Sequence, residues 1–106
     1  MSARLRFTPE AAAELREASA WHETQREGLG EAFVDALFGP LDRVRAPPHA
    51  FTLYAAVPGV RRALVQRFHF AIYYRPAPGE MLVVAVLHQR RSPKALTPRL
   101  RNVPTG

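Results

Sequence analysis

Residues 81–88 read MLVVAVLH and are apolar at every position except the last. A strand with one face in water alternates apolar and polar residues, whereas a strand covered on both faces is apolar throughout. A helix that crosses a membrane needs about 20 apolar residues, so this run is far too short for that role. The sequence therefore predicts a strand at the centre of a sheet whose two faces are both covered.

A helix is predicted from Pro9 to about Gln25. Thr8 suits the N-cap, Pro9 suits the first helical position, and a carboxylate such as Glu10 is favourable in the first turn. Trp21 is expected in the core at the edge of the apolar stripe. The stripe itself consists of Ala11, Leu15, Ala18 and His22.

A second helix is predicted to begin at Leu29, after a glycine-containing turn, and to end at Pro47-Pro48. Pro40 has no N–H to donate to the carbonyl of Ala36, so a kink or a lost hydrogen bond is expected there. The face toward the sheet is expected to carry Phe33, Leu37, Leu41 and Val44.

The rest of the chain predicts strands and turns. Residues 68–75 alternate cleanly, residues 60–67 alternate loosely, and residues 51–54 are either a short edge strand or an irregular segment. With a short strand at 5–7, the order is β-α-α-β-β-β. The predicted fold class is α+β, with an N-terminal strand and a helical hairpin packed on a small twisted, mostly antiparallel sheet.

The length of 106 residues is that of a single domain. The domain is expected at residues 1–93, followed by a proline-containing tail at 94–106 with a possible short helix. The N-terminus lacks the apolar core of a signal peptide, so a cytoplasmic protein with no membrane segment is expected.

Charge is divided unevenly along the chain. The whole chain carries 15 Lys and Arg against 9 acids, yet Glu80 is the only acid after residue 42. The later part of the chain therefore favours an anionic partner, either nucleic acid or an acidic protein.

Several kinds of site are excluded or disfavoured. No cysteine is present, which removes disulfides, thiolate metal sites and cysteine nucleophiles. The four histidines lack the spacing of a metal site on one helix, and the glycines are too scattered for a phosphate-binding loop. No metal and no cofactor are expected.

What remains is a basic group. Arg61, Arg62 and Arg67 are expected on one strand, and adjacent antiparallel strands would bring them near the end of the central strand at His88, Arg90 and Arg91. With Tyr73 and Tyr74 nearby, such a group can bind phosphates and stack bases, or stabilise a phosphodiester transition state. The alternative is that the arginines are solvated and His88 satisfies a local hydrogen bond.

Several short motifs occur together, in order, along the chain. They are FTPEAAAEL, Trp21-His22, Gly28-Leu29-Gly30 with Phe33, Pro47, Gly59-Val60-Arg61-Arg62, residues 68–74 and AVLHQRR at 85–91. On these motifs, residues 4–93 resemble toxins of the RelE/ParE superfamily, from bacterial type II toxin–antitoxin systems. The hairpin and C-terminal landmarks are more similar to the ParE branch.

The resemblance implies a toxin that inhibits DNA gyrase and is neutralised by a cognate antitoxin, with operator DNA reached only through that antitoxin. The alternatives are a degenerate member that only binds antitoxin, or a ribosome-dependent mRNA endoribonuclease. In the ribonuclease, Arg61 and Arg67 would hold the phosphate, His88 would act as general acid or base, and Arg91 would stabilise transition-state charge. No tyrosine follows Tyr74 and no lysine lies in residues 43–93, which departs from the RelE pattern.

The resemblance also implies an acidic or amphipathic antitoxin segment that orders on the toxin. The expected target- or antitoxin-binding residues are Arg61, Arg62, Arg67, His88, Arg90 and Arg91.

Overall fold

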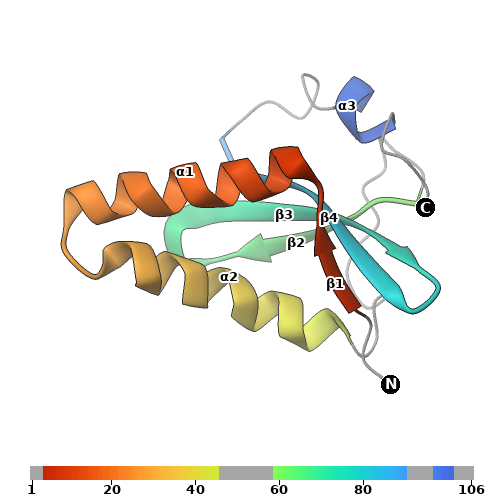
Figure 1. Ribbon diagram of the computed structural model, residues 1–106, viewed down its shortest axis with the longest axis horizontal. Helices are drawn as coiled ribbons and strands as arrows, with labels where there is room; N and C mark the ends of the chain where they lie inside the picture. Colours follow the sequence, from red (N-terminus) through yellow and green to blue (C-terminus); the bar gives the residue numbers. More distant parts are fainter. Residues whose placement is uncertain (1–3, 46–58, 91–96, 102–106) are drawn as a thin grey trace.

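The computed structural model describes residues 4–45, 59–90 and 97–101. Two helices lie on one face of a four-stranded sheet, and a short third helix lies near one end of it (Figure 1). In chain order the elements are β1 (Arg4–Phe7), α1 (Pro9–Gln25), α2 (Leu29–Arg45), β2 (Arg61–Val65), the 3-10 turn η1 (Arg67–His69), β3 (Phe70–Ala77), β4 (Glu80–His88) and α3 (Thr97–Arg101).

The sheet has the strand order β1-β4-β3-β2. β1 runs parallel to β4, whereas the β2–β3 and β3–β4 pairs are antiparallel. The α+β class and the order of elements are therefore as predicted. β4 lies between β1 and β3, so the apolar run at 81–88 does form an inner strand.

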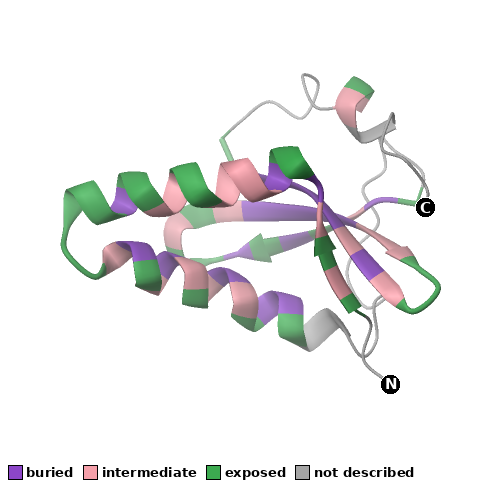
Figure 2. Cartoon of the chain, viewed as in Figure 1, coloured by how far each residue is buried: buried purple, intermediate pink, exposed green. Residues whose placement is uncertain are grey.

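Both faces of β4 are buried (Figure 2), but the alternation is interrupted. The register with β3 shifts between Tyr73, which pairs with Ala85, and Tyr74, which pairs with Val83. Val84 is the extra residue of this β-bulge, and a bulge changes which face the following side chains point to. The core on the helix side contains Met81, Val83 and Val86, and the core on the opposite side contains Val84, Ala85 and Leu87.

The two helices begin and pack as their sequences predict. Thr8 caps α1, with its hydroxyl accepting the N–H of Ala11 at 3.1 Å. Pro40 lies inside α2, where it can donate no hydrogen bond, and the helix continues past it to Arg45. The stripe residues Phe33, Leu37 and Leu41 are buried in the core beneath the hairpin.

One arginine of α3 (Thr97–Arg101) makes hydrogen bonds to both α1 and β4. Arg99 donates to both carboxylate oxygens of Glu14, at 2.8 and 2.9 Å, and to the carbonyl of Val84 at 2.7 Å. Glu14 also accepts the N–H of Val86 at 3.0 Å. The hydrogen bonds that Arg99 donates to Glu14 stabilise the charged guanidinium and raise the pKa of Arg99.

Three sequence predictions need correction. Trp21 was expected in the core, but 59% of its surface is exposed. Phe68 was expected in a strand, but it lies in η1 with φ of 71°, so β3 begins only at Phe70. Arg67 also lies in η1 and not on the strand that carries Arg61 and Arg62.

Two further predictions concern segments outside the described residues, namely the possible strand at 51–54 and the site residue Arg91. In the part of the chain that is described, no helix is both long enough and apolar enough to cross a membrane. Nor does that part gather three histidine or acidic side chains in the way a metal ion would need.

Candidate functional site

The turn between α1 and α2 is fixed by one carboxylate. Glu23 accepts the N–H groups of Gly28 and Gly30, each at 2.9 Å. These backbone hydrogen bonds stabilise the ionised form and lower the pKa of Glu23 below its usual 4.5. The sequence motif Gly28-Leu29-Gly30 therefore serves to present backbone donors to a side chain of the preceding helix.

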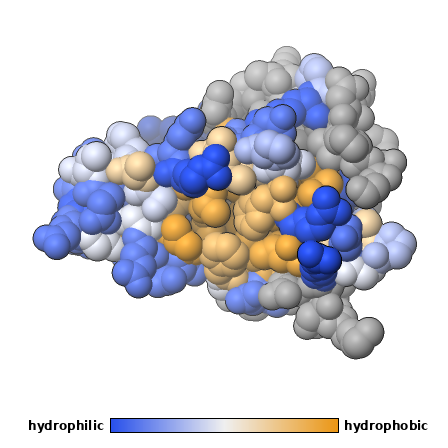
Figure 3. Space-filling view, in the orientation of Figure 1, coloured by the Kyte–Doolittle hydropathy of each residue, from blue (hydrophilic) through white to orange (hydrophobic). Residues whose placement is uncertain are grey.

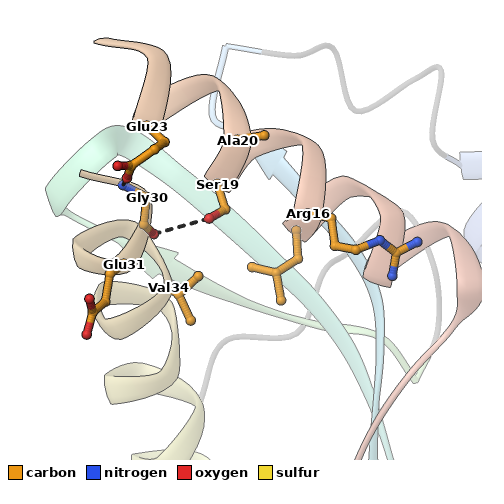
Figure 4. A pocket seen from close by; sticks show the side chains of 8 residues that line it. Arg16, Ser19, Ala20, Glu23, Gly30, Glu31 and Val34 are labelled. Atoms are coloured by element: carbon orange, nitrogen blue, oxygen red, sulfur yellow. Dashed lines mark hydrogen bonds between the residues drawn. The ribbon is translucent and has the colours of Figure 1, made fainter. Parts of the chain in front are cut away.

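The helices approach most closely where Gly30 meets Ser19. The Ser19 hydroxyl donates to the carbonyl of Gly30 at 3.3 Å (Figure 4), and a Cβ at position 30 would lie only 2.7 Å from the Ser19 carbonyl oxygen. Glycine is thus required here by close packing. Beside this contact lies an open hollow of about 440 Å³, which we call the helix groove; it is lined by Leu15, Arg16, Ser19, Ala20, Glu23, Gly30, Glu31 and Val34.

The helix groove continues into an apolar face between the two helices (Figure 3). Side chains from three elements are only partly buried there, and the rings of Phe7 and Phe38 lie 6.2 Å apart. We define the apolar face by Leu5 and Phe7 of β1, Leu15 of α1, and Val34 and Phe38 of α2. A contiguous apolar patch of this kind is typical of a surface that binds another protein.

A second hollow, the aromatic pocket, lies on the opposite side of α1. It encloses about 450 Å³ and is lined by Ala18, Trp21, His22, Phe68, Phe70 and His88. The ring of His22 stacks on Phe33 at 4.5 Å and meets Phe68 edge-on at 4.8 Å. A shallower hollow adjoins the pocket, where Glu14 and Glu17 of α1 face Val86 and Leu87 of β4.

The two histidines of the aromatic pocket are held in different tautomers. The Nδ1 of His22 lies 2.6 Å from the carbonyl of Ala18, and since a carbonyl only accepts, this nitrogen carries the proton. The Nδ1 of His88 accepts the N–H of Arg90 at 3.1 Å, so its neutral ring carries the proton on Nε2. His88 thus makes the local hydrogen bond that the alternative interpretation of the sequence expected.

The predicted basic residues do not form one group. Arg61 pairs with Tyr74, whereas His88 pairs with Phe70, which itself pairs with Val65. Arg61 and Val65 are four residue steps apart along β2, so Arg61 lies roughly 14 Å along the sheet from the level of His88. Arg61 and Arg62 are successive strand residues and therefore point to opposite faces of the sheet.

At the other end of the sheet the structure does bring predicted residues together. The guanidinium carbon of Arg67 lies 4.9 Å from the centre of the Phe68 ring. Arg90 lies two residues after His88, and the N–H of Gln89 between them bonds the carbonyl of His69 at 2.8 Å. His88 therefore lines the aromatic pocket, and Arg67 and Arg90 lie next to residues that line it, whereas Arg61 and Arg62 lie apart from it.

Two features of these surfaces have little or no signal in the sequence. Nothing in the local pattern places Phe68 on the helix side, because its position depends on a left-handed backbone that aromatic residues rarely adopt. The capping role of Glu23 has a weak signal in the sequence. Two glycines, Gly28 and Gly30, follow this carboxylate by five and seven residues at the start of the next helix.

The hairpin on a mixed sheet is the fold of a known toxin–antitoxin chain. A solved structure of the chromosomal ParDE TA system from P. aeruginosa superposes with a TM-score of 0.62 at 20% sequence identity, over 82% of this chain and 96% of that chain. No curated protein matches the chain. The sequence profile of the ParE toxin of the type II toxin–antitoxin system, parDE, matches residues 5–93, and the chain therefore belongs to the ParE toxin family.

Proposed function

We propose that this toxin inhibits DNA gyrase and is neutralised by a cognate antitoxin. The observation that carries the proposal is the family match over residues 5–93, which spans the hairpin and all four strands. The aromatic pocket supports a mode of action through protein contacts, since its lining consists mainly of rings that can pack against a partner.

The ribonuclease alternative is less well supported by the geometry. Arg61 lies roughly 14 Å along the sheet from the level of His88, so the two cannot act on one phosphate without a large rearrangement. The Nδ1 of His88 is already occupied by the N–H of Arg90. An arginine that holds the phosphate and a histidine that acts as general acid or base must both reach the same reacting group.

The antitoxin is best accommodated on the apolar face. Tight binding between proteins depends on a few buried apolar anchors at the centre of an interface. The apolar face offers several partly exposed side chains of this type from β1, α1 and α2, with Arg16 and Glu31 at the margin of the adjoining helix groove. An amphipathic antitoxin segment would cover it.

Expression in bacterial cells tests the proposal. Induction should arrest growth, and plasmid from the arrested cells should become relaxed or linearised. Co-expression of the antitoxin from the adjacent reading frame should restore growth. Codon-phased cuts in translated mRNA, with plasmid supercoiling unchanged, would contradict gyrase as the target and support the ribonuclease.

A further inference from the structure

We propose that the aromatic pocket is the surface with which this toxin holds its protein target, separate from the apolar face that binds the antitoxin. The occupant is a protein segment that inserts one aromatic or branched aliphatic side chain and places a carboxylate beside it. This inference rests on the proposed function, which supplies a protein target and an antitoxin.

The first observation is the exposure of Trp21. It is the only tryptophan of the chain, and it stands 59% exposed beside a pocket whose other walls, apart from Ala18, are rings. Its own ring meets His22 edge-on at 4.9 Å, and His22 is in turn fixed by Ala18 and Phe33. Tryptophan is among the residue types that most often dominate a protein interface, and this one is exposed next to an apolar hollow.

The second observation is the left-handed backbone conformation in η1. Phe68 and His69 both have positive φ, 71° and 57°, although neither is glycine. A positive φ is unfavourable for a residue with a side chain, and strain of this kind gathers at functional sites. Here it turns the Phe68 ring back onto His22 and Phe33, at 4.8 and 5.4 Å, where the ring forms one wall of the pocket.

Charge around the pocket defines the partner. Arg67 and Arg90 are exposed on the strand side, whereas the exposed Glu17 lies in the adjoining hollow on the α1 side. A nucleic-acid backbone crossing the pocket would meet the carboxylate of Glu17 as well as the arginines, and like charges in apposition are unfavourable. A protein segment with a single acidic residue next to its anchor can face the arginines alone.

The position of α1 explains how two partners can compete. At 100° per residue, the residues that line the helix groove point away from Glu14, Glu17 and Trp21, so one helix forms the common wall of both surfaces. A helix is about 10 Å wide, so an antitoxin on the apolar face lies close enough to exclude a large target from the pocket.

The test uses Trp21→Ala, with Leu64→Ala as its matched control. Leu64 is the other large hydrophobic residue that is exposed among those described, at 42%, and it lies on β2 away from the pocket. Each variant is compared with the wild-type chain for gyrase inhibition, growth arrest and antitoxin affinity. Trp21→Ala should weaken gyrase inhibition about 30-fold or more, the size of a hot-spot loss, and should abolish growth arrest.

Antitoxin affinity decides the outcome. We expect it to change less than threefold in both variants, which also shows that Trp21→Ala is folded. Equal loss of antitoxin binding and toxicity, or full toxicity of Trp21→Ala, would overturn the inference.

A second measurement observes Trp21 directly. Because Trp21 is the only tryptophan, a chain labelled with 5-fluorotryptophan gives a single fluorine resonance, which purified gyrase should shift. If duplex DNA alone shifts this resonance, the proposal that a protein segment occupies the pocket is wrong.

Failure of the proposed function gives a different pattern. If wild-type chain arrests growth without inhibiting gyrase, the gyrase proposal fails. Loss of that arrest in Trp21→Ala, with antitoxin binding intact, then still supports the pocket as the target surface. A wild-type chain that neither arrests growth nor responds to gyrase overturns both.

Discussion

Arg99 and Glu14 form a two-point ion pair across 85 residues of chain, with Nη1 and Nη2 of the guanidinium at 2.8 and 2.9 Å from the two carboxylate oxygens. The pair joins α3 to α1, and both partners also bond the backbone of β4, at Val84 and Val86. A single contact thus connects the C-terminal helix, the first helix and the inner strand.

This pair predicts a strong coupling in stability. Arg99→Ala leaves the carboxylate of Glu14, whose side chain is only 16% exposed, without its partner. Because the site is partly open to solvent, we expect a loss of about 1–3 kcal/mol in the free energy of unfolding. Denaturant unfolding of Arg99→Ala, Glu14→Gln and the double variant measures the coupling; strictly additive losses would show that the pair contributes nothing.

Gly30→Ala tests the close approach of the helices. The new methyl group would lie 2.7 Å from the carbonyl oxygen of Ser19, so the helices must separate. We expect a loss of about 1–3 kcal/mol in unfolding free energy. Gly39→Ala, in the same helix with no atom within 4 Å of the added carbon, is the control and should change stability by less than about 1 kcal/mol. Equal effects would remove the packing argument.

Glu23 predicts part of the acid sensitivity. Its folded pKa is lowered by the N–H groups of Gly28 and Gly30, so its contribution is present above the usual value of 4.5 and is lost as pH falls through the lowered pKa. Urea unfolding from pH 7 to pH 2.5 should show a smaller acid-induced loss in Glu23→Gln than in wild type. Glu27→Gln, on the exposed turn, should follow the wild-type curve. The account fails if Glu23→Gln follows that curve as well.

Arg61 and Arg62 lie on β2, outside the apolar face, so we expect their charge to steer the approach of the antitoxin and not to anchor it. Reversal of Arg61 and Arg62 to glutamate should slow association about tenfold or more at low salt and leave dissociation little changed. Salt near 0.5 M should have the same effect on wild-type chain, because the screening length falls to a few Å. The control is the reversal of Arg67 and Arg90, which changes the net charge by the same amount at the other end of the sheet. If stopped-flow measurements show that both charge reversals slow association equally, neither arginine pair is a specific landing site for the antitoxin.

Much of the fold follows from patterns that are local in the sequence. The apolar run at 81–88 specifies an inner strand, and Thr8, Pro9 and the apolar stripes specify the hairpin, because each depends only on neighbouring residues. Trp21 was misplaced since periodicity locates a residue on a helix face but does not show which tertiary neighbours cover it. Here none of the described elements buries its ring.

The arrangement of the site depends on long-range geometry. The basic residues are split because β3 lies between β2 and β4, and because η1 removes Arg67 from β2. Neither the strand order nor the left-handed turn at Phe68 has a signal in residue spacing. The aromatic pocket is assembled from α1, η1, β3 and β4, so only the folded structure brings its walls together.

Supercoiling by purified gyrase tests the central claim most directly. Relaxed plasmid, ATP and gyrase are incubated with increasing amounts of the wild-type chain, alone or after mixing with the antitoxin. The account predicts that the chain alone blocks supercoiling in a dose-dependent manner, and that an equimolar amount of antitoxin restores it. Unchanged supercoiling at a large molar excess of folded chain, without accumulation of cleaved plasmid, would contradict it.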